Sequence, residues 1–281
     1  MSLARGHLSG NTPAVTIDEQ VRRHYELHDE AQRLWQPGLG TLTRLRTWDI
    51  FDRHLPPSGR VADVGGGPGT HARHLAERGY EVVLVDPLPR HVEQAARTGA
   101  AAGVSCLLGD ARALPLPDAS AEAVLMLGPL YHLVEASDRG RALAEALRVL
   151  RPGGRLVAEA ITRHAWIVDA ASQGLLGQEG IWETFELNLR CGLSNDPQRV
   201  GEGVFWGYFH RPDELAAEVG QAGFGDVRLL AVEGFAGLLG NLDELLKQPD
   251  RLLRAIRLTE CEPSMLGVSA HVVAVAAKPL A

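Results

Sequence analysis

The chain has no apolar run of about 18 residues, the length that a membrane-spanning helix needs. Its N-terminus has no apolar segment after the first basic residue, so the sequence gives no indication of export. The three cysteines, Cys106, Cys191 and Cys261, lack the C-x-x-C spacing of a metal or redox motif. These absences predict a cytoplasmic protein with no membrane partner and no metal.

Positive charge is also scarce, since the formal net charge is -7 at pH 7. A protein that follows nucleic-acid phosphates needs clustered Lys and Arg side chains, so the charge argues against a nucleic-acid partner and favours a small-molecule acceptor. The length of 281 residues fits one large domain with insertions.

The most informative stretch is VADVGGGPGT, from Val61 to Thr70. A short buried-strand pattern runs into a glycine turn, and a helical pattern follows at once. Glycines let the backbone approach a ligand closely, so this order is typical of a nucleotide-binding site. The dinucleotide fingerprint G-x-G-x-x-G is incomplete, because Thr70 occupies the third glycine position and Pro68 removes a backbone amide. The turn therefore argues against NAD.

Three further apolar runs end in chemically useful residues. The run from Val82 to Val85 ends at Asp86, where a carboxylate can accept hydrogen bonds from two ribose hydroxyls. The next run leads into Gly109-Asp110-Ala111, and the following one leads into LGPLYHL, which ends at Leu133. Because the carboxyl ends of parallel strands meet at one edge of a sheet, we expect these residues to share a single ligand site.

Asp63 before the G-x-G-x-G turn, Asp86 and the LGPLYHL segment together resemble the class I S-adenosylmethionine (SAM) methyltransferases, in particular bacterial small-molecule enzymes with an HRPDEL segment. The specific resemblance covers about residues 59–162. It implies an α/β fold: a seven-stranded Rossmann-like sheet whose last strand is antiparallel, with an N-terminal helical lid and helical cap insertions. It also implies SAM as cofactor and S-adenosylhomocysteine (SAH) as product. The cofactor-binding residues that it implies are Asp63, Gly65, Gly66, Gly67, Gly69, Asp86, Pro87, Asp110, Ala111, Leu127, Gly128 and His132.

Composition and periodicity divide the chain into five parts. We expect a flexible arm over 1–15, a helical lid over 16–57, a SAM-binding Rossmann-like core over 58–162, an aromatic-rich substrate cap over 163–210, and the C-terminal part of the core over 211–281 with a second helical insertion at 235–267. Within the lid, Thr16 and Glu19 match a capping box, and a second helix is expected from Leu42 to His54. Pro249 should divide the helical stretch of the second insertion in two.

Aromatic residues gather outside the predicted core. The whole chain has five Trp, four Tyr and six Phe, and seven of these aromatic residues lie in the cap insertion. Residues 59–162 hold only Tyr80 and Tyr131. These rings could fill a small core of the cap itself, or they could line an apolar acceptor pocket. The second interpretation gives the substrate-binding candidates Tyr25, Trp166, Trp182, Phe185, Trp206, Tyr208, His210 and Arg211.

Methyl transfer from a sulfonium is a one-step displacement, so the protein mainly aligns the reactants, excludes water and removes a proton from the acceptor. His210 is the first candidate for the base because it directly precedes a predicted helix at the carboxyl edge. Tyr25 and His132 are the other catalytic candidates, followed by His164, Glu159 and Glu233. A structural role is the alternative for His210, as a helix cap, and for Tyr25, as a packing residue.

The resemblance and the Ala- and Arg-rich composition imply a bacterial enzyme of secondary-metabolite biosynthesis, and indole-containing cyclic dipeptides are among the acceptors that it brings into view. Two other functions fit the same sequence. One is a SAM-fold enzyme for a different step, such as a cyclisation, and the other is a non-catalytic SAM-binding module. The acceptor atom stays open, and an apolar face on the N-terminal helices would allow a homo-oligomer.

Overall fold

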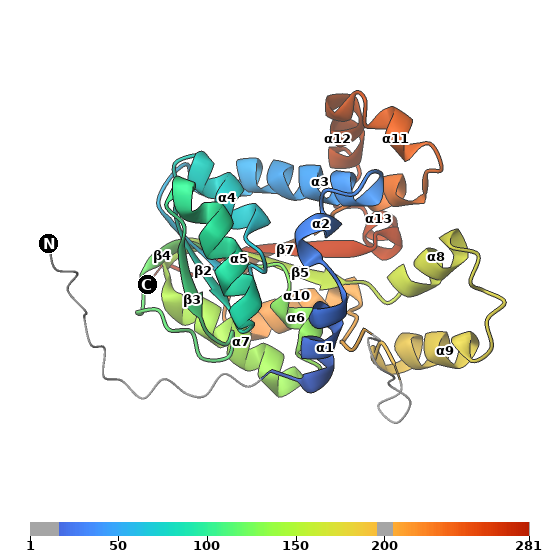
Figure 1. Cartoon of the computed structure of the whole chain (residues 1–281), viewed down its shortest axis with the longest axis horizontal. Helices are drawn as coiled ribbons and strands as arrows, with labels where there is room; N and C mark the ends of the chain where they lie inside the picture. The colour runs from blue at the N-terminus through green and yellow to red at the C-terminus, as the bar shows by residue number, and fades with distance from the viewer. Residues whose placement is uncertain (1–16, 196–204, 281) are drawn as a thin grey trace, which may run out of the picture.

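A seven-stranded sheet forms the centre of the molecule, with helices on both of its faces (Figure 1). The computed structural model describes residues 17–195 and 205–280. The strand order is β3-β2-β1-β4-β5-β7-β6, and β7 is antiparallel to both of its neighbours. The strands are β1 (Arg60–Val64), β2 (Glu81–Asp86), β3 (Ser105–Leu108), β4 (Ala121–Met126), β5 (Leu150–Ile161), β6 (Gly225–Ala231) and β7 (His271–Ala277).

The helices follow the order that the sequence predicts for a Rossmann-like fold. They are α1 (Glu19–Leu27), α2 (Glu30–Arg33), α3 (Leu39–His54), α4 (Thr70–Glu77), α5 (Pro89–Gly99), α6 (Pro129–His132), α7 (Ala136–Val149), α8 (Ala165–Ser172), α9 (Ile181–Cys191), α10 (Pro212–Gln221), α11 (Leu242–Leu245), α12 (Pro249–Arg257) and α13 (Pro263–Val268), with 3-10 turns η1 (Ala100–Ala102) and η2 (Gly234–Leu238).

The central strands are buried on both faces, which explains why β1, β2, β4 and β7 are largely apolar. Successive residues of β4 point to opposite faces, so Val124 packs in one apolar cluster and Leu125 in the other. The first cluster includes Leu143 of α7, and the second includes Ile50 of α3. The predicted seven-stranded fold with an antiparallel last strand is therefore confirmed.

The N-terminal helices differ from the prediction at their starts. Helix α1 begins at Glu19, and Asp18 caps it by accepting a hydrogen bond from the Gln20 amide (2.7 Å). The predicted capping residue Thr16 and the predicted arm over 1–15 lie outside the described residues. Helix α3 begins at Leu39, three residues before the predicted start. The sequence does not predict α2, because four residues are too short to show helical periodicity.

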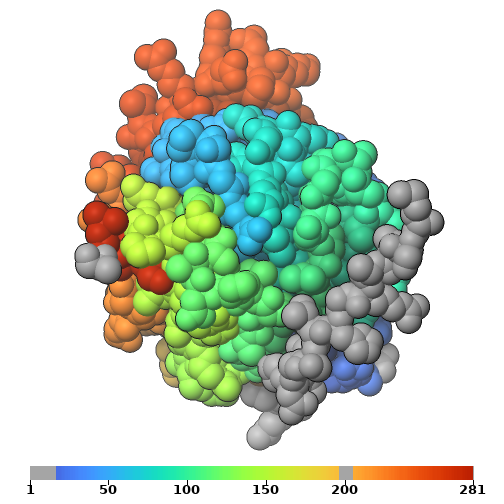
Figure 2. All heavy atoms as spheres, turned by 90° about the vertical axis from the view of Figure 1, so that its left-hand side faces the viewer, coloured from blue at the N-terminus to red at the C-terminus, as the bar shows by residue number. Residues whose placement is uncertain are grey.

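The second insertion projects from the body of the molecule as α11 and α12 (Figures 1 and 2). As predicted, Pro249 divides the helical stretch, since it is the first residue of α12. Arg46 of α3 anchors the insertion from below and has no exposed surface. It donates hydrogen bonds to Glu260 (2.7 Å), to Asp49 and to the carbonyl oxygens of Ala231 (3.1 Å) and Val232 (2.9 Å).

Candidate active site

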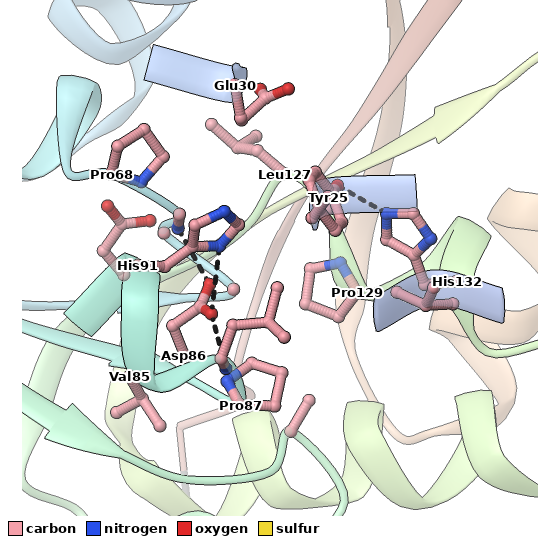
Figure 3. A pocket seen from close by; sticks show the side chains of 18 of the residues that line it. Tyr25, Glu30, Pro68, Val85, Asp86, Pro87, His91, Leu127, Pro129 and His132 are labelled. Atoms are coloured by element: carbon pink, nitrogen blue, oxygen red, sulfur yellow. Dashed lines mark hydrogen bonds and ion pairs between the residues drawn. The ribbon is translucent and has the colours of Figure 1, made fainter. Parts of the chain in front are cut away.

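A cavity lies at the carboxyl edge of the sheet, beneath the N-terminal helices (Figure 3). Its floor consists of the glycine turn and of residues at the carboxyl ends of β1 to β5. Helices α1 and α2 cover it with Val21, Tyr25, Glu30 and Arg33. The predicted cofactor residues that line the cavity are Asp63, Gly65, Gly66, Gly67, Asp86, Pro87, Asp110, Ala111, Leu127, Gly128 and His132.

The glycine turn presents bare backbone to this cavity. Gly65 has a φ of 68°, and a Cβ at this position would lie 2.7 Å from Cγ of Pro129. A Cβ on Gly66 would lie 2.6 Å from Oδ2 of Asp63. A larger residue at either position would therefore displace Pro129 or the side chain of Asp63. Gly69 differs from these two, because it is the N-cap of α4 and is not among the described residues that line the cavity. A Cβ there would lie 3.0 Å from Cβ of Ala95, and its cofactor contact stays a prediction.

Asp86 ends β2 and fixes the glycine turn from the other side. Its Oδ2 accepts a hydrogen bond from the Gly67 amide (2.9 Å), and its Oδ1 accepts one from the Leu88 amide (2.9 Å). Nδ1 of His91 lies 3.2 Å from the same Oδ1. His91 also lines the cavity, although it is not among the residues predicted from the sequence. Its position five residues after Asp86, in the first turn of the next helix, could have indicated this.

Asp110 lines the cavity as one half of an ion pair. Arg112 donates to it from the backbone amide (2.8 Å), from Nε (2.9 Å) and from Nη2 (2.6 Å). Arg112 also contacts Asp138 at 2.6 Å. The predicted amine-binding carboxylate is thus held in place by a neighbouring guanidinium, and an adenine amine would share it with Arg112.

Tyr25 of α1 and His132 of α6 meet inside the cavity (Figure 3). Oη of Tyr25 lies 2.7 Å from Nε2 of His132, although the two residues are 107 positions apart in the sequence. Burial, with a smaller effect of His24, lowers the pKa of His132 to about 3. Burial, with smaller effects of Tyr131 and Glu30, raises the pKa of Tyr25 well above its usual value. At neutral pH the pair is therefore a neutral phenol beside a neutral imidazole.

Comparison with known proteins gives the family. Residues 62–158 match a family model described as a methyltransferase domain. An uncharacterised methyltransferase of Mycobacterium tuberculosis is 42% identical over 109 residues, a match that covers 38% of this chain and only 42% of that relative. The demethylmenaquinone methyltransferase of Beutenbergia cavernae is 32% identical over 180 residues, which are 64% of this chain and 69% of that protein. The chain belongs to the class I SAM-dependent methyltransferases.

The fold of this methyltransferase also agrees with solved structures. A SAM-dependent methyltransferase of Methanosarcina mazei superposes with a TM-score of 0.57 at 20% identity, covering 83% of this chain and 98% of the other. At that identity the likeness concerns the fold alone.

The cofactor of the family is SAM, and the cavity fits it. The glycine turn forms part of the cavity wall with bare backbone, and Asp86 lies at the strand end beside it. Oδ2 of Asp63 is buried without a hydrogen-bond partner among the described residues. Burial and the nearby Asp86 raise the pKa of Asp63 to about 7, although a hydrogen bond with the backbone of Ala72 opposes the shift. A ligand donor would satisfy this oxygen.

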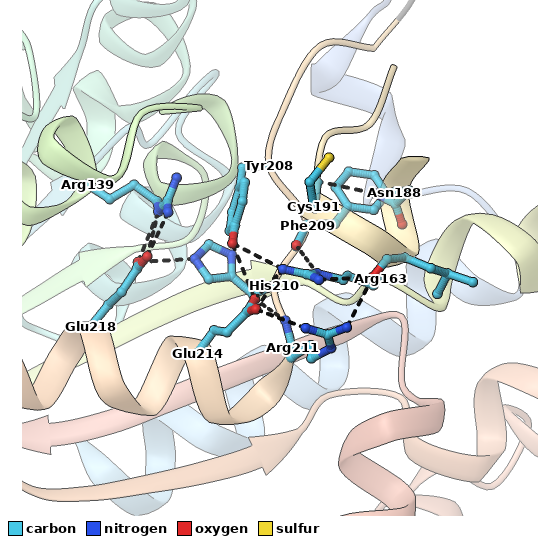
Figure 4. Close-up of polar contacts among 12 residues, drawn as sticks. Arg139, Arg163, Asn188, Cys191, Tyr208, Phe209, His210, Arg211, Glu214 and Glu218 are labelled. Carbon is cyan, nitrogen blue, oxygen red and sulfur yellow. Dashed lines mark hydrogen bonds and ion pairs between the residues drawn. The ribbon is translucent and has the colours of Figure 1, made fainter. Parts of the chain in front are cut away.

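His210, the first candidate for the base, lies outside the cavity (Figure 4). Its side chain has no exposed surface, and its Nε2 lies 3.2 Å from Glu218. Arg139 pairs with the same carboxylate (2.7 Å) and stacks on the ring of Tyr208 (3.8 Å). Burial lowers the pKa of His210, although Glu218 opposes the shift. His210 is not among the described residues that line the cavity, and its Nδ1 has no hydrogen-bond partner in the described part of the chain. Its catalytic role stays a prediction.

The other polar substrate candidates belong to the same network. Tyr208 donates a hydrogen bond from its hydroxyl to Glu214 (3.3 Å). Arg211 is the N-cap residue of α10 and pairs with Glu214 through its side chain (3.4 Å). Neither residue is among the described residues that line the cavity, and their substrate contacts stay predictions.

The aromatic candidates of the cap pack mainly on one another. The rings of Trp166 and Phe209 are 5.5 Å apart, and those of Trp182 and Phe185 are 5.7 Å apart. Trp166, Trp182, Phe185 and Trp206 are not among the described residues that line the cavity. Phe205 comes closer, since its ring lies 5.4 Å from that of His132 and 6.1 Å from that of Tyr131. The aromatic count did not distinguish Phe205 from its neighbours.

Two further base candidates, His164 and Glu233, are not among the described residues that line the cavity. His164 is exposed, and its Nδ1 lies 2.9 Å from the carbonyl oxygen of Gly267. Glu233 has no exposed surface and accepts hydrogen bonds from Thr43 Oγ1 (2.8 Å), Ser269 Oγ (3.0 Å) and the backbone amide of His271 (3.0 Å). Nδ1 of His271 lies 2.7 Å from its Oε1. Burial alone would raise the pKa of Glu233, but His271 outweighs it and holds the pKa at about 2.

This ion pair predicts how stability depends on pH. Glu233 raises the pKa of His271 to about 9 against the effect of burial. The contribution of His271 to folding stability is complete below its unfolded pKa of 6.5 and is lost as the pH rises through 9. The contribution of Glu233 to folding stability is complete above its unfolded pKa of 4.5 and is lost as the pH falls through 2. We expect His271→Gln to reduce the free energy of unfolding by about 1–3 kcal/mol between pH 4.5 and pH 6.5, where both contributions are complete. Urea denaturation across the pH range measures this difference, and a difference that does not vary with pH would contradict the ion pair.

Proposed function

We propose that this methyltransferase transfers a methyl group from SAM to a small aromatic acceptor that carries an ionisable O–H or N–H group. The contact between Tyr25 and His132 is the observation that carries the proposal. It places a neutral imidazole at the cavity, and Nε2 of this ring can accept a proton from an acceptor that lies against it, although burial lowers its pKa to about 3. The ring of Tyr131, which lines the cavity beside it, supplies an apolar surface for an aromatic acceptor, and the ring of Phe205 lies 5.4 Å from that of His132.

Bound SAM supplies an electrophilic methyl group on a positively charged sulfur. The protein contributes position and proton transfer. In the tautomer of His132 that carries its proton on Nδ1, Tyr25 donates a hydrogen bond to Nε2, and this contact orients the ring. When an acceptor displaces the tyrosine hydroxyl from this nitrogen, Nε2 is free to take the acceptor proton. Loss of that proton raises the electron density on the acceptor oxygen or nitrogen and on the ring carbons conjugated with it.

Two acceptor types meet this description. The relative from Beutenbergia cavernae is named as a demethylmenaquinone methyltransferase, and a reduced quinone is an aromatic ring with ionisable hydroxyls. An indole-containing cyclic dipeptide, which the sequence analysis brings into view, offers an aromatic ring with an N–H group. Both fit a partly aromatic cavity, so the proposal covers this class and not one member of it.

The test is SAH formation with 1,4-naphthoquinol and with a tryptophan-containing cyclic dipeptide. We expect at least one to give SAH in equal amount to methylated product, and His132→Asn to lower kcat by about 10²-fold, the lower end of what proton transfer contributes. Binding of SAH, measured by calorimetry, should stay within about threefold, since this proton transfer serves the acceptor and not the cofactor.

Two matched variants complete this test. Tyr25→Phe keeps the ring and removes the hydroxyl, so it should change kcat less than His132→Asn does. His164→Asn, at an exposed histidine outside the cavity, is the control for the loss of an imidazole. Methyl transfer at the same rate in wild type and His132→Asn would contradict the proposed proton transfer. Absence of SAH with both acceptors would contradict the acceptor class.

A further inference from the structure

Glu159 is a buried carboxylate that the proposed reaction does not use. It follows Ala158 of β5, which pairs with Met126 of β4, so it lies beside Leu127 at the carboxyl edge of the sheet. Its exposed fraction is only 5%, and it lines the cavity. Its side chain receives no hydrogen bond from any residue in the described part of the chain. A buried carboxylate without donors is costly, which indicates that a ligand supplies them.

The neighbouring strand-end carboxylate makes the contrast clear. Glu233 receives hydrogen bonds from Thr43, Ser269 and His271, and it does not line the cavity. Glu159 lies on β5, two residues before Ile161, which pairs with His271 of β7. Its carboxylate nevertheless receives no hydrogen bond from Thr43, Ser269 or His271. The fold therefore satisfies one of the two carboxylates itself and leaves the other open to the cavity.

The surroundings of Glu159 favour a cation. Its side chain lies on the same face of β5 as Val157, which packs with Ile50 of α3, and Thr43 and Thr47 of α3 line the same cavity. Both threonine hydroxyls donate to the protein, Thr43 to Glu233 and Thr47 to the carbonyl oxygen of Thr43. Their oxygens therefore face a ligand as acceptors only.

The charged side chains around this part of the cavity also favour a bound cation. Glu30 pairs with Arg33 (2.7 Å), the one cation of α2 that lines the cavity. Arg33 and His271 lie close enough to act on Glu159 through space, but each is paired elsewhere, Arg33 with Glu30 and His271 with Glu233. Within the described part of the chain, neither Asp63 nor Glu159 forms an ion pair of its own. An ammonium group carries one positive charge and three donors, so it matches a site made of acceptors and a carboxylate.

We propose that Glu159 binds an ammonium group of the ligand and that this residue makes the cavity selective for an amine. The inference rests on the proposed function, because it assigns a role inside the same cavity. The ammonium has two sources with the same chemistry, the α-amino group of the cofactor's amino-acid part and an amine on the acceptor. Glu159 thus acts in binding and does not take part in the proton transfer between Tyr25 and His132.

Calorimetry with SAH and with an analogue in which hydrogen replaces the α-amino group tests the first source. If Glu159 binds the cofactor, wild-type protein should prefer SAH by about 10- to 100-fold, the effect of a hydrogen bond to a charged group. Glu159→Gln should then lose this preference and bind the analogue as wild type does. Glu93→Gln, an exposed residue of α5, is the matched control and should retain it.

Tryptamine and 3-ethylindole, each added to the SAH complex, test the second source. Tighter binding of tryptamine to wild type, lost in Glu159→Gln, would place the ammonium on the acceptor. The comparison of ligands in wild type stands even if Glu159→Gln fails to fold. No preference for the amine in either wild-type ligand pair, or a preference that Glu159→Gln retains, would overturn the inference. Absence of SAH binding to wild type would instead remove the proposed function itself.

Discussion

Replacing Arg46 by leucine is expected to lower the free energy of unfolding by about 3–5 kcal/mol. Arg46 is fully buried, and it donates hydrogen bonds to Glu260, Asp49 and two backbone carbonyl oxygens. Removal of the guanidinium leaves two buried carboxylates with less charge compensation and two carbonyl oxygens without donors. Arg53 also pairs with Glu260 (2.6 Å), so part of the cluster persists in the variant.

Chemical denaturation followed by circular dichroism measures this loss. Arg22→Leu is the matched control, because Arg22 is about half exposed and pairs only with Glu19 in the described part of α1. We expect it to change stability by less than about 1 kcal/mol. Equal effects of the two substitutions would show that the cluster around Arg46 contributes no more than a surface ion pair.

Asp86→Ala is expected to weaken SAM and SAH binding by roughly 10³-fold. Two hydrogen bonds to a charged carboxylate contribute about 3–6 kcal/mol together, and we propose that the ribose hydroxyls make them. The substitution also frees the amides of Gly67 and Leu88, which Asp86 now holds at 2.9 Å. The glycine turn would therefore lose both a ligand contact and its fixed geometry.

Calorimetric titration with SAH measures the effect on binding. Asp52→Ala is the control, since Asp52 is about half exposed and pairs with Arg78 away from the cavity. A SAH affinity that Asp86→Ala leaves within a few-fold of wild type would show that the ribose binds elsewhere.

The sequence predicts the core of this methyltransferase well because its signals are local. Each buried strand is an apolar run that ends in a turn residue, and parallel strands bring these ends to one edge. Asp63, Asp86 and Asp110 therefore meet at the cavity, as expected from their places in the chain alone. The start of α12 at Pro249 could also be predicted from the sequence, since proline begins a helix more readily than it continues one.

The rest depends on contacts between distant segments. His210 directly precedes a helix at the correct edge, but the sequence does not show that Glu218 and Arg139 enclose its ring. Helix α2 is too short to leave a periodic pattern, so Glu30 and Arg33 could not be placed at the cavity. The cap aromatics gave no means to separate rings that pack on one another from Phe205, which reaches His132.

The position of α1 over the cavity also has a consequence for the rate of turnover. Tyr25 and Val21 reach the ligand site from a helix of only nine residues, and we expect this helix to move when a bound nucleoside leaves. That motion would then govern how fast spent product exchanges for fresh cofactor, and the slowest step of the cycle would be a movement of the chain. Amide hydrogen exchange in α1 should accordingly slow when SAH binds.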